Sequence, residues 1–154
     1  MHNSSLISKD FPQCFYRTVV KGLYVKDSKI LLVKEAPHLA DKWELPGGGL
    51  DFGEDPHAGL VREIKEELNL DVTSVSKQPM YVWMNKFEGC RNMDFYYSVV
   101  LAYQVNLANL DFIPTKEVVA VKLFSLDELK DLRDDLYHQS RKLWEIFNPA
   151  DFKK

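Results

Sequence analysis

The sequence has few cysteines and no dense basic run, and each absence narrows the choice of function. Its two cysteines, Cys14 and Cys90, form no CxxC or Cys/His ligand spacing, so we expect free thiols in a reducing compartment. The formal net charge is −3, from 20 Lys and Arg against 23 Asp and Glu. With no basic cluster, binding to a long nucleic acid is disfavoured, although a small phosphorylated ligand needs only local positive charge.

Long hydrophobic runs are also lacking. The most apolar stretch, FYYSVVLAYQV, is too short and too interrupted to cross a bilayer. The first residues, MHNSSLISKDFPQC, show no apolar signal-peptide region. We therefore expect a cytoplasmic protein without a membrane partner. Its 154 residues, 45% hydrophobic and 28% charged, are typical of one globular domain with a real core.

The pattern of apolar and polar residues predicts an α+β domain, with more strand than simple βαβ winding would give. Strands are expected at residues 16–26, 29–34, 72–86, 93–106 and 118–124, and a last amphipathic helix at residues 137–147.

Two helices carry start signals. Asp55 followed by Pro56 predicts an N-cap and a first helical position, and apolar residues then recur with a spacing of three to four. Asn69 predicts the end of that helix, because Asn tolerates the left-handed conformation. Ser125 and Glu128 form the pattern of a capping box that opens a shorter helix.

A long loop at residues 35–55 precedes the first helix. It holds four of the seven glycines, Gly47, Gly48, Gly49 and Gly53. Long ordered loops are usually functional, and glycine permits a positive φ or the close approach of another group.

Three glutamates share one face of the first helix. Glu63, Glu66 and Glu67 stand at positions i, i+3 and i+4, where like charges destabilise a helix by about 0.2–0.5 kcal/mol per pair. One interpretation is a solvated acidic surface. The other is a site for Mg²⁺ or Mn²⁺, since hard cations prefer carboxylate oxygens and would remove the repulsion.

The residues around these glutamates resemble the signature of the Nudix hydrolase superfamily. That signature is Gly, five spacers, Glu, seven spacers, then Arg-Glu-apolar-x-Glu-Glu-x-Gly-apolar. The matching positions are Gly48, Glu54, Arg62, Glu63, Ile64, Glu66, Glu67 and Leu70. The departure is Asn69, where the family has Gly. The segment HLADKWELPGG before the signature is similar to MutT-type members, and VVAVKLFSLDEL is similar to the closing element of the family.

This resemblance implies one Nudix domain over residues 16–147, preceded by an N-terminal extension at residues 1–15. The implied fold is an α/β/α sandwich in which a mixed β-sheet is flanked by helices.

The resemblance also implies roles for the matching residues. Glu63, Glu66 and Glu67 would be the metal ligands, joined by the carbonyl of Gly47. Either Glu67 or Glu63 would act on the attacking water, because family members differ in which acid is the base. Glu54 would support a metal or its water.

The resemblance implies further roles. Arg62 is expected to orient a glutamate through an ion pair. Glu117 lies where several family members place another acidic ligand or base, although a solvated glutamate is an equal alternative. His38 and Lys34 are candidates for substrate binding between the second strand and the signature, with simple surface polarity as the alternative.

Aromatic residues offer faces on which a base can stack. Trp83 is the main candidate for substrate binding, together with Tyr81 and Phe87. In a strand, Trp83 and Tyr81 share a face, so core packing is the competing interpretation.

The implied activity is metal-dependent hydrolysis of a nucleoside diphosphate linked to another moiety, with Mg²⁺ or Mn²⁺ as cofactor. We expect a nucleoside triphosphate, cleaved to monophosphate and pyrophosphate, by a monomer or homodimer. The alternatives are an ADP-ribose or NDP-sugar pyrophosphatase, an RNA 5′-end pyrophosphohydrolase, and a catalytically silent nucleotide-sensing module. An isomerase on the same scaffold would need a catalytic cysteine, which neither cysteine supplies easily.

Overall fold

The computed structural model describes residues 15–90 and 92–152. Cys14 and the expected extension, apart from Phe15, lie outside the described residues. The elements follow in the order β1 (Tyr16–Leu23), β2 (Val25–Lys26), β3 (Lys29–Glu35), β4 (Trp43–Glu44), α1 (Pro56–Leu68), β5 (Val72–Val75), β6 (Tyr81–Glu88), β7 (Phe95–Leu107), β8 (Val118–Phe124), α2 (Leu126–Leu132) and α3 (Leu143–Ile146).

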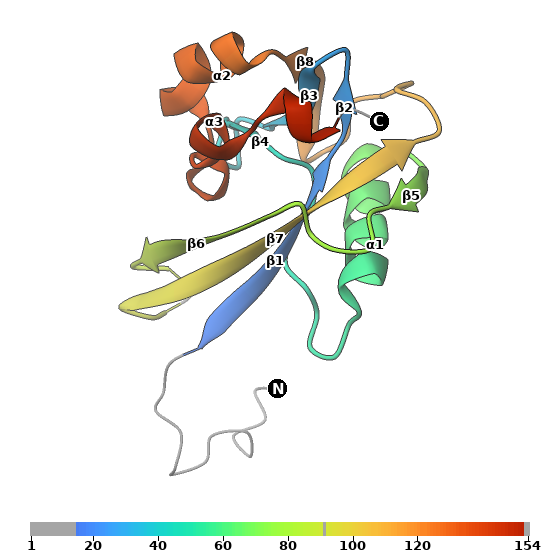
Figure 1. The fold of residues 1–154 in the computed structure, drawn as a ribbon. Helices are drawn as coiled ribbons and strands as arrows, with labels where there is room; N and C mark the ends of the chain where they lie inside the picture. The colour runs from blue at the N-terminus through green and yellow to red at the C-terminus, as the bar shows by residue number, and fades with distance from the viewer. Residues whose placement is uncertain (1–14, 91, 153–154) are drawn as a thin grey trace.

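The strands form two four-stranded sheets (Figure 1). In the first, β7 pairs in parallel with β1 and antiparallel with β6 and β5. In the second, β3 pairs antiparallel with β2, β4 and β8. The expected mixed sheet is thus confirmed, with α1 beside the first sheet and α2 and α3 beside the second (Figure 1).

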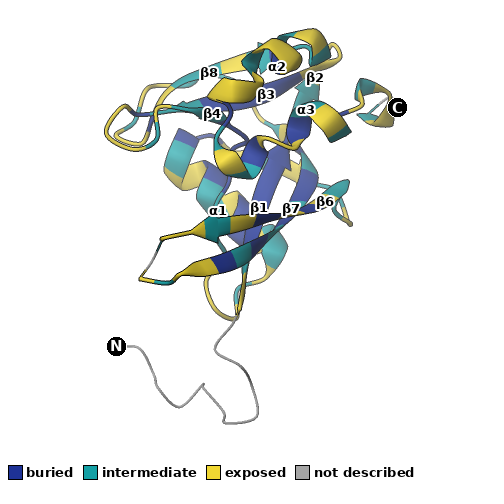
Figure 2. Ribbon diagram, turned by 90° about the vertical axis from the view of Figure 1, so that its left-hand side faces the viewer, coloured by how far each residue is buried: buried dark blue, intermediate teal, exposed yellow. Residues whose placement is uncertain are grey.

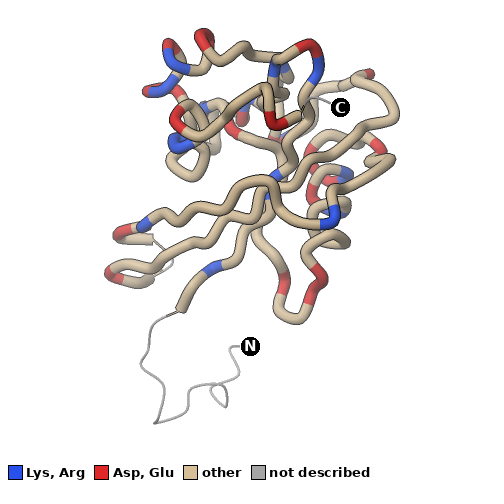
Figure 3. Tube along the Cα trace, viewed as in Figure 1, with Lys and Arg blue, Asp and Glu red and all other residues tan. Residues whose placement is uncertain are grey.

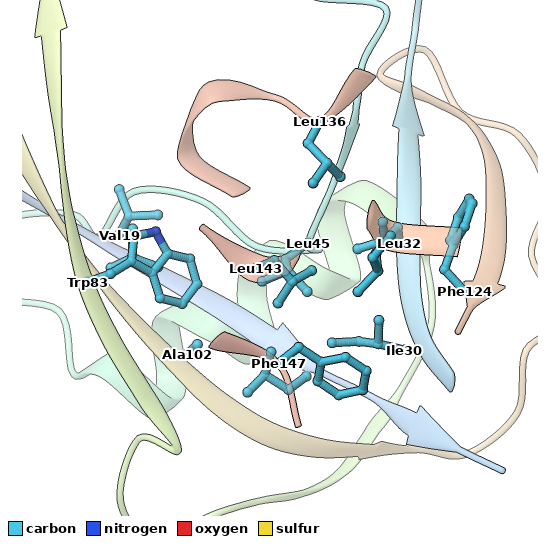
Figure 4. Close-up of a cluster of buried hydrophobic side chains, with 13 residues drawn as sticks. Val19, Ile30, Leu32, Leu45, Trp83, Ala102, Phe124, Leu136, Leu143 and Phe147 are labelled. Atoms are coloured by element: carbon cyan, nitrogen blue, oxygen red, sulfur yellow. The ribbon is translucent and has the colours of Figure 1, made fainter. Parts of the chain in front are cut away.

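Two hydrophobic clusters hold the sheets and helices together. Because side chains alternate along a strand, Val19 enters the cluster between the two sheets while Val20 enters the cluster under α1. The middle parts of β1 and β7 are accordingly buried, as Figure 2 shows. Figure 4 shows the cluster between the sheets, to which the C-terminal segment adds Leu143 and Phe147.

Three expected elements differ in the structure. The strand expected at 16–26 is divided into β1 and β2, which pair in different sheets. The single strand expected at 72–86 is divided into β5 and β6, and the helix expected at 137–147 is a 3₁₀ turn at His138–Ser140 followed by the four-residue α3. Long-range bonds explain the interrupted helix: Tyr137 donates its N–H to the Trp43 carbonyl, and Ser140 Oγ accepts from Leu45 N.

Among residues 15–90 and 92–152, no helix is long and apolar enough to cross a membrane.

Candidate functional site

The helix α1 begins and ends at the residues that the sequence predicts. The Asp55 carboxylate accepts from Ala58 N at 3.0 Å, and Pro56 occupies the first helical position. Asn69 adopts a left-handed conformation with φ 52°, and its N–H donates to the Lys65 carbonyl. These local bonds fix where the three glutamates lie on the helix.

Arg62 ties the acidic residues of α1 to the loop before it. Its guanidinium binds Glu54 in a fork, with Nε–Oε1 and Nη2–Oε2 distances of 2.7 and 2.8 Å. The Nη1 atom donates to Glu63 at 2.8 Å and to Glu66 at 3.1 Å. The Arg62 hydrogen bonds lower the pKa of Glu54 to about 2. The predicted ion pairing by Arg62 is therefore present, and acidic positions gather along α1 and the preceding loop (Figure 3).

Glu67 is held differently from the other two glutamates. Its Oε2 accepts from the backbone N–H of Gly47 at 2.9 Å. Burial raises the pKa of Glu67 to about 8, although the nearby Lys21 opposes the shift. A proton acceptor with this pKa is suited to work near neutral pH.

Each of the three glutamates uses one carboxylate oxygen for a protein partner. Within the described residues, the second oxygens of Glu63, Glu66 and Glu67 have no hydrogen-bond partner. The Glu63 carboxylate also lies against Gly48, where an added Cβ would come within 2.6 Å of it. Oriented carboxylates beside glycine backbone are suitable donors for Mg²⁺ or Mn²⁺.

The carboxylates of Glu63, Glu66 and Glu67 do not surround a single point. In residues 15–90 and 92–152, no group of three His, Cys, Asp or Glu side chains has the spacing of a formed metal site. The donor chemistry therefore fits a divalent cation, and the cation itself would draw the free oxygens together.

A buried lysine beneath this site was not predicted. Lys21 is 1% exposed and its Nζ donates to Glu44 Oε2 at 2.9 Å, to the Leu45 carbonyl at 3.0 Å and to the Gly47 carbonyl at 2.7 Å. Burial acts to lower the pKa of Lys21, but Glu44 and Glu67 raise it above its ordinary value. The sequence signal for its burial is the position of this lysine among apolar residues of a predicted strand.

Two further groups carry shifted pKa values near Glu44. Burial, followed by a hydrogen bond with Glu44, raises the pKa of Glu35 to about 7. Burial and the charges of Glu44 and Glu35 raise the pKa of Tyr137. The interior beside the loop is therefore rich in titratable groups, as functional sites often are.

Within the described residues, the side chains of the remaining predicted site residues make no hydrogen bond to the three glutamates. The Gly47 carbonyl, expected to reach a metal, accepts from Lys21, which leaves it one lone pair. Lys34 binds the carbonyl of Asp41 at 2.6 Å. His38 and Glu117 are both exposed, and the described residues show no hydrogen bond from either side chain.

Trp83 lies in the core, where its ring points into the cluster between the sheets (Figure 4). It is 9% exposed, and its indole N–H donates to the Gln139 carbonyl at 2.8 Å. This placement favours packing over base stacking. By contrast, Phe87 is only half-buried and lines an open cavity of about 480 Å³ with Tyr137 and His138.

An α/β sandwich whose glutamate-bearing helix follows a glycine-rich loop is the arrangement that the sequence signature implies. Comparison with known proteins gives the family: a model described as the NUDIX domain matches residues 16–145, so the chain belongs to the Nudix family.

The chain is also similar to several known proteins. A "Putative 8-oxo-dGTP diphosphatase 2" of Mycobacterium tuberculosis is 42% identical over 60 residues, which are 38% of this chain and 43% of that protein. An "RNA pyrophosphohydrolase" of Acidiphilium cryptum is 42% identical over 57 residues, 34% of this chain and 35% of that protein. These matches thus span less than half of each relative. The crystal structure of a "MutT NUDIX hydrolase" from Burkholderia pseudomallei superposes with a TM-score of 0.68 at 25% identity, covering 87% of this chain and 99% of that one.

Proposed function

We propose that this protein is a metal-dependent pyrophosphohydrolase that cleaves a nucleoside triphosphate to monophosphate and pyrophosphate. One observation carries the proposal: Glu63, Glu66 and Glu67 share one helix face, and within the described residues each has one oxygen bonded to the protein and one without a hydrogen-bond partner. The names of the similar proteins, a diphosphatase and a pyrophosphohydrolase, support the same reaction class.

The chemistry requires charge neutralisation, because the oxygens of a diphosphate repel an incoming nucleophile. Bound Mg²⁺ or Mn²⁺ would supply that neutralisation and lower the pKa of a bound water. Glu63, Glu66 and Glu67 would hold the cation, with Glu67 or Glu63 accepting the proton of the water. Arg62 and Glu54 would keep the carboxylates in place through the ion pairs described above.

A substrate panel tests the proposal. The protein is incubated with Mg²⁺ or Mn²⁺ and with canonical and oxidised nucleoside triphosphates, nucleoside-diphosphate sugars including ADP-ribose, and dinucleoside polyphosphates. The released phosphate species are then identified. We expect monophosphate and pyrophosphate from a nucleoside triphosphate, only with metal present. Hydrolysis of the sugar compounds alone would replace the proposed substrate, and no hydrolysis of any compound would favour a nucleotide sensor.

The exposed Asp127 of α2 provides a control, because it lies on a different helix from the glutamates. Asp127→Asn should retain wild-type activity, whereas Glu63→Gln should lose most of it.

A further inference from the structure

The ammonium of Lys21 is buried among partners that all belong to one short segment. Its three acceptors lie on Glu44, Leu45 and Gly47. We infer that Lys21 is a positioning residue for catalysis, which rests on the proposed function: it fixes the loop so that the Gly47 N–H holds Glu67 in its working orientation.

Lys21 makes more hydrogen bonds than are needed to neutralise its charge. An ion pair with Glu44 alone would neutralise the charge, yet two of the three bonds go to backbone carbonyls. The Leu45 and Gly47 carbonyls lie on either side of the Pro46–Gly47 peptide, and that peptide carries the N–H that donates to Glu67. The Lys21 side chain therefore holds the backbone on both sides of the Gly47 N–H.

The loop has little freedom at this point. Gly22 N donates to the Pro46 carbonyl at 2.8 Å, and Val20 N donates to the Gly48 carbonyl at 2.9 Å. Gly47 itself has φ +122°, and an added Cβ would collide with the Val20 carbonyl. Because β1 backbone and the Lys21 side chain hold the segment together, the position of the Gly47 N–H is set by β1.

Loss of this support should loosen Glu67 without unfolding the protein, provided that no charge is left buried alone. Lys21→Met by itself would leave Glu44, 6% exposed, without its partner. The informative variant is therefore Lys21→Met/Glu44→Met, which removes both charges and keeps apolar volume in the interior.

The experiment compares this double variant with the wild type in three measurements. Thermal unfolding and near-ultraviolet circular dichroism report the fold, steady-state kinetics with Mg²⁺ separate kcat from the nucleotide KM, and electron paramagnetic resonance reports Mn²⁺ affinity. We expect a folded variant with kcat and Mn²⁺ affinity reduced about 10- to 100-fold, as is usual when support of a metal ligand is lost. With Mg²⁺ at a saturating concentration, the nucleotide KM should stay within about threefold, because the variant alters the support of Glu67 and not a residue that contacts the nucleotide. The exposed pair Lys142→Met/Glu145→Met is the matched control and should change none of these values.

A folded double variant with wild-type kcat and Mn²⁺ affinity would overturn the inference. If the double variant does not fold, Lys21→Arg decides: it keeps the positive charge but not the three bond directions, so wild-type kcat in that variant would also refute positioning. A wild type that hydrolyses no nucleotide would contradict the proposed function instead, and the change in Mn²⁺ affinity would still test the role of Lys21.

Discussion

At the scale of single residues, Glu67 differs from its neighbours on α1. Glu63 and Glu66 share the guanidinium of Arg62, whereas Glu67 accepts from the Gly47 N–H and has the charge of Lys21 nearby. Burial disfavours the charged form of the Glu67 carboxyl and raises its pKa, so that Glu67 keeps its proton to a higher pH than an ordinary glutamate.

Substitution of Glu67 should affect chemistry far more than folding. Glu67→Gln preserves the shape of the side chain and an oxygen for the Gly47 N–H, but removes the negative charge. We expect kcat to fall by about 10²- to 10⁴-fold, the usual range for loss of a general base or metal ligand. Kinetics with Mg²⁺ and a urea unfolding curve measure the two effects. Wild-type turnover by this variant would show that the role assigned to Glu67 is wrong.

Metal binding should depend on pH through the same residue. The pKa of Glu67 in the metal-free protein is about 8, above its ordinary value of 4.5, so the group is largely protonated at pH 6. A cation must displace that proton, and Mn²⁺ affinity should therefore rise with pH by up to about tenfold per unit until pH 8 and then level off.

Mn²⁺ titrations at several pH values measure this dependence. Glu67→Gln has no proton to lose at this position and should give a flatter profile. Equal pH dependence in the variant and the wild type would assign the titration to another group, such as Glu35, whose pKa is about 7.

At the scale of elements, α1 owes its position in the chain to its caps. The Asp55 carboxylate satisfies one of the free N–H groups of the first turn, and the left-handed Asn69 closes the last turn. These are short-range interactions, and for that reason the sequence predicts α1 correctly at both ends.

Removal of the N-cap of α1 should lower the stability of the folded protein. Asp55→Ala leaves the Ala58 N–H without its acceptor and should lower the free energy of unfolding by about 1 kcal/mol. Denaturation with urea measures the loss, with the exposed Asp111→Ala as a control that should have no such effect. An unchanged unfolding midpoint in Asp55→Ala would mean that the cap does not determine the stability of α1.

The C-terminal segment shows where prediction from local pattern fails. Residues 137–147 have helical spacing of apolar residues, but tertiary bonds from Tyr137 to Trp43 and from Ser140 to Leu45 interrupt the helix. The partners are about a hundred residues away in the chain, so no local signal reveals them. The same holds for Lys21, whose place in strand β1 was predictable while its hydrogen bonds to the loop were not.

At the scale of the whole molecule, the aromatic side chains of β6 divide between core and cavity. Trp83 joins the two sheets and bonds to Gln139, whereas Phe87 stacks on Tyr96 at 5.2 Å and faces the cavity shared with His138. The sequence put both into one group of possible stacking residues, because burial depends on the packing of distant segments.

Two substitutions separate these roles. Trp83→Phe removes the indole hydrogen bond and some core volume, and it should cost about 1–3 kcal/mol of stability with nucleotide KM unchanged. Phe87→Leu should instead raise the nucleotide KM about tenfold with little loss of stability, because base stacking on an aromatic ring is worth about 1–3 kcal/mol. Urea unfolding and steady-state kinetics on both variants provide the comparison. The reverse pattern would place the base against Trp83.

The proposed function requires the carboxylates of Glu63, Glu66 and Glu67 to bind a divalent cation that in turn binds a diphosphate. Its most direct test is an anomalous difference map from crystals grown with Mn²⁺ and a non-hydrolysable nucleoside triphosphate analogue. We expect manganese peaks within coordination distance of these glutamates and of the analogue's phosphate oxygens. Manganese and nucleotide bound elsewhere, with this face of α1 directed into bulk solvent, would contradict it.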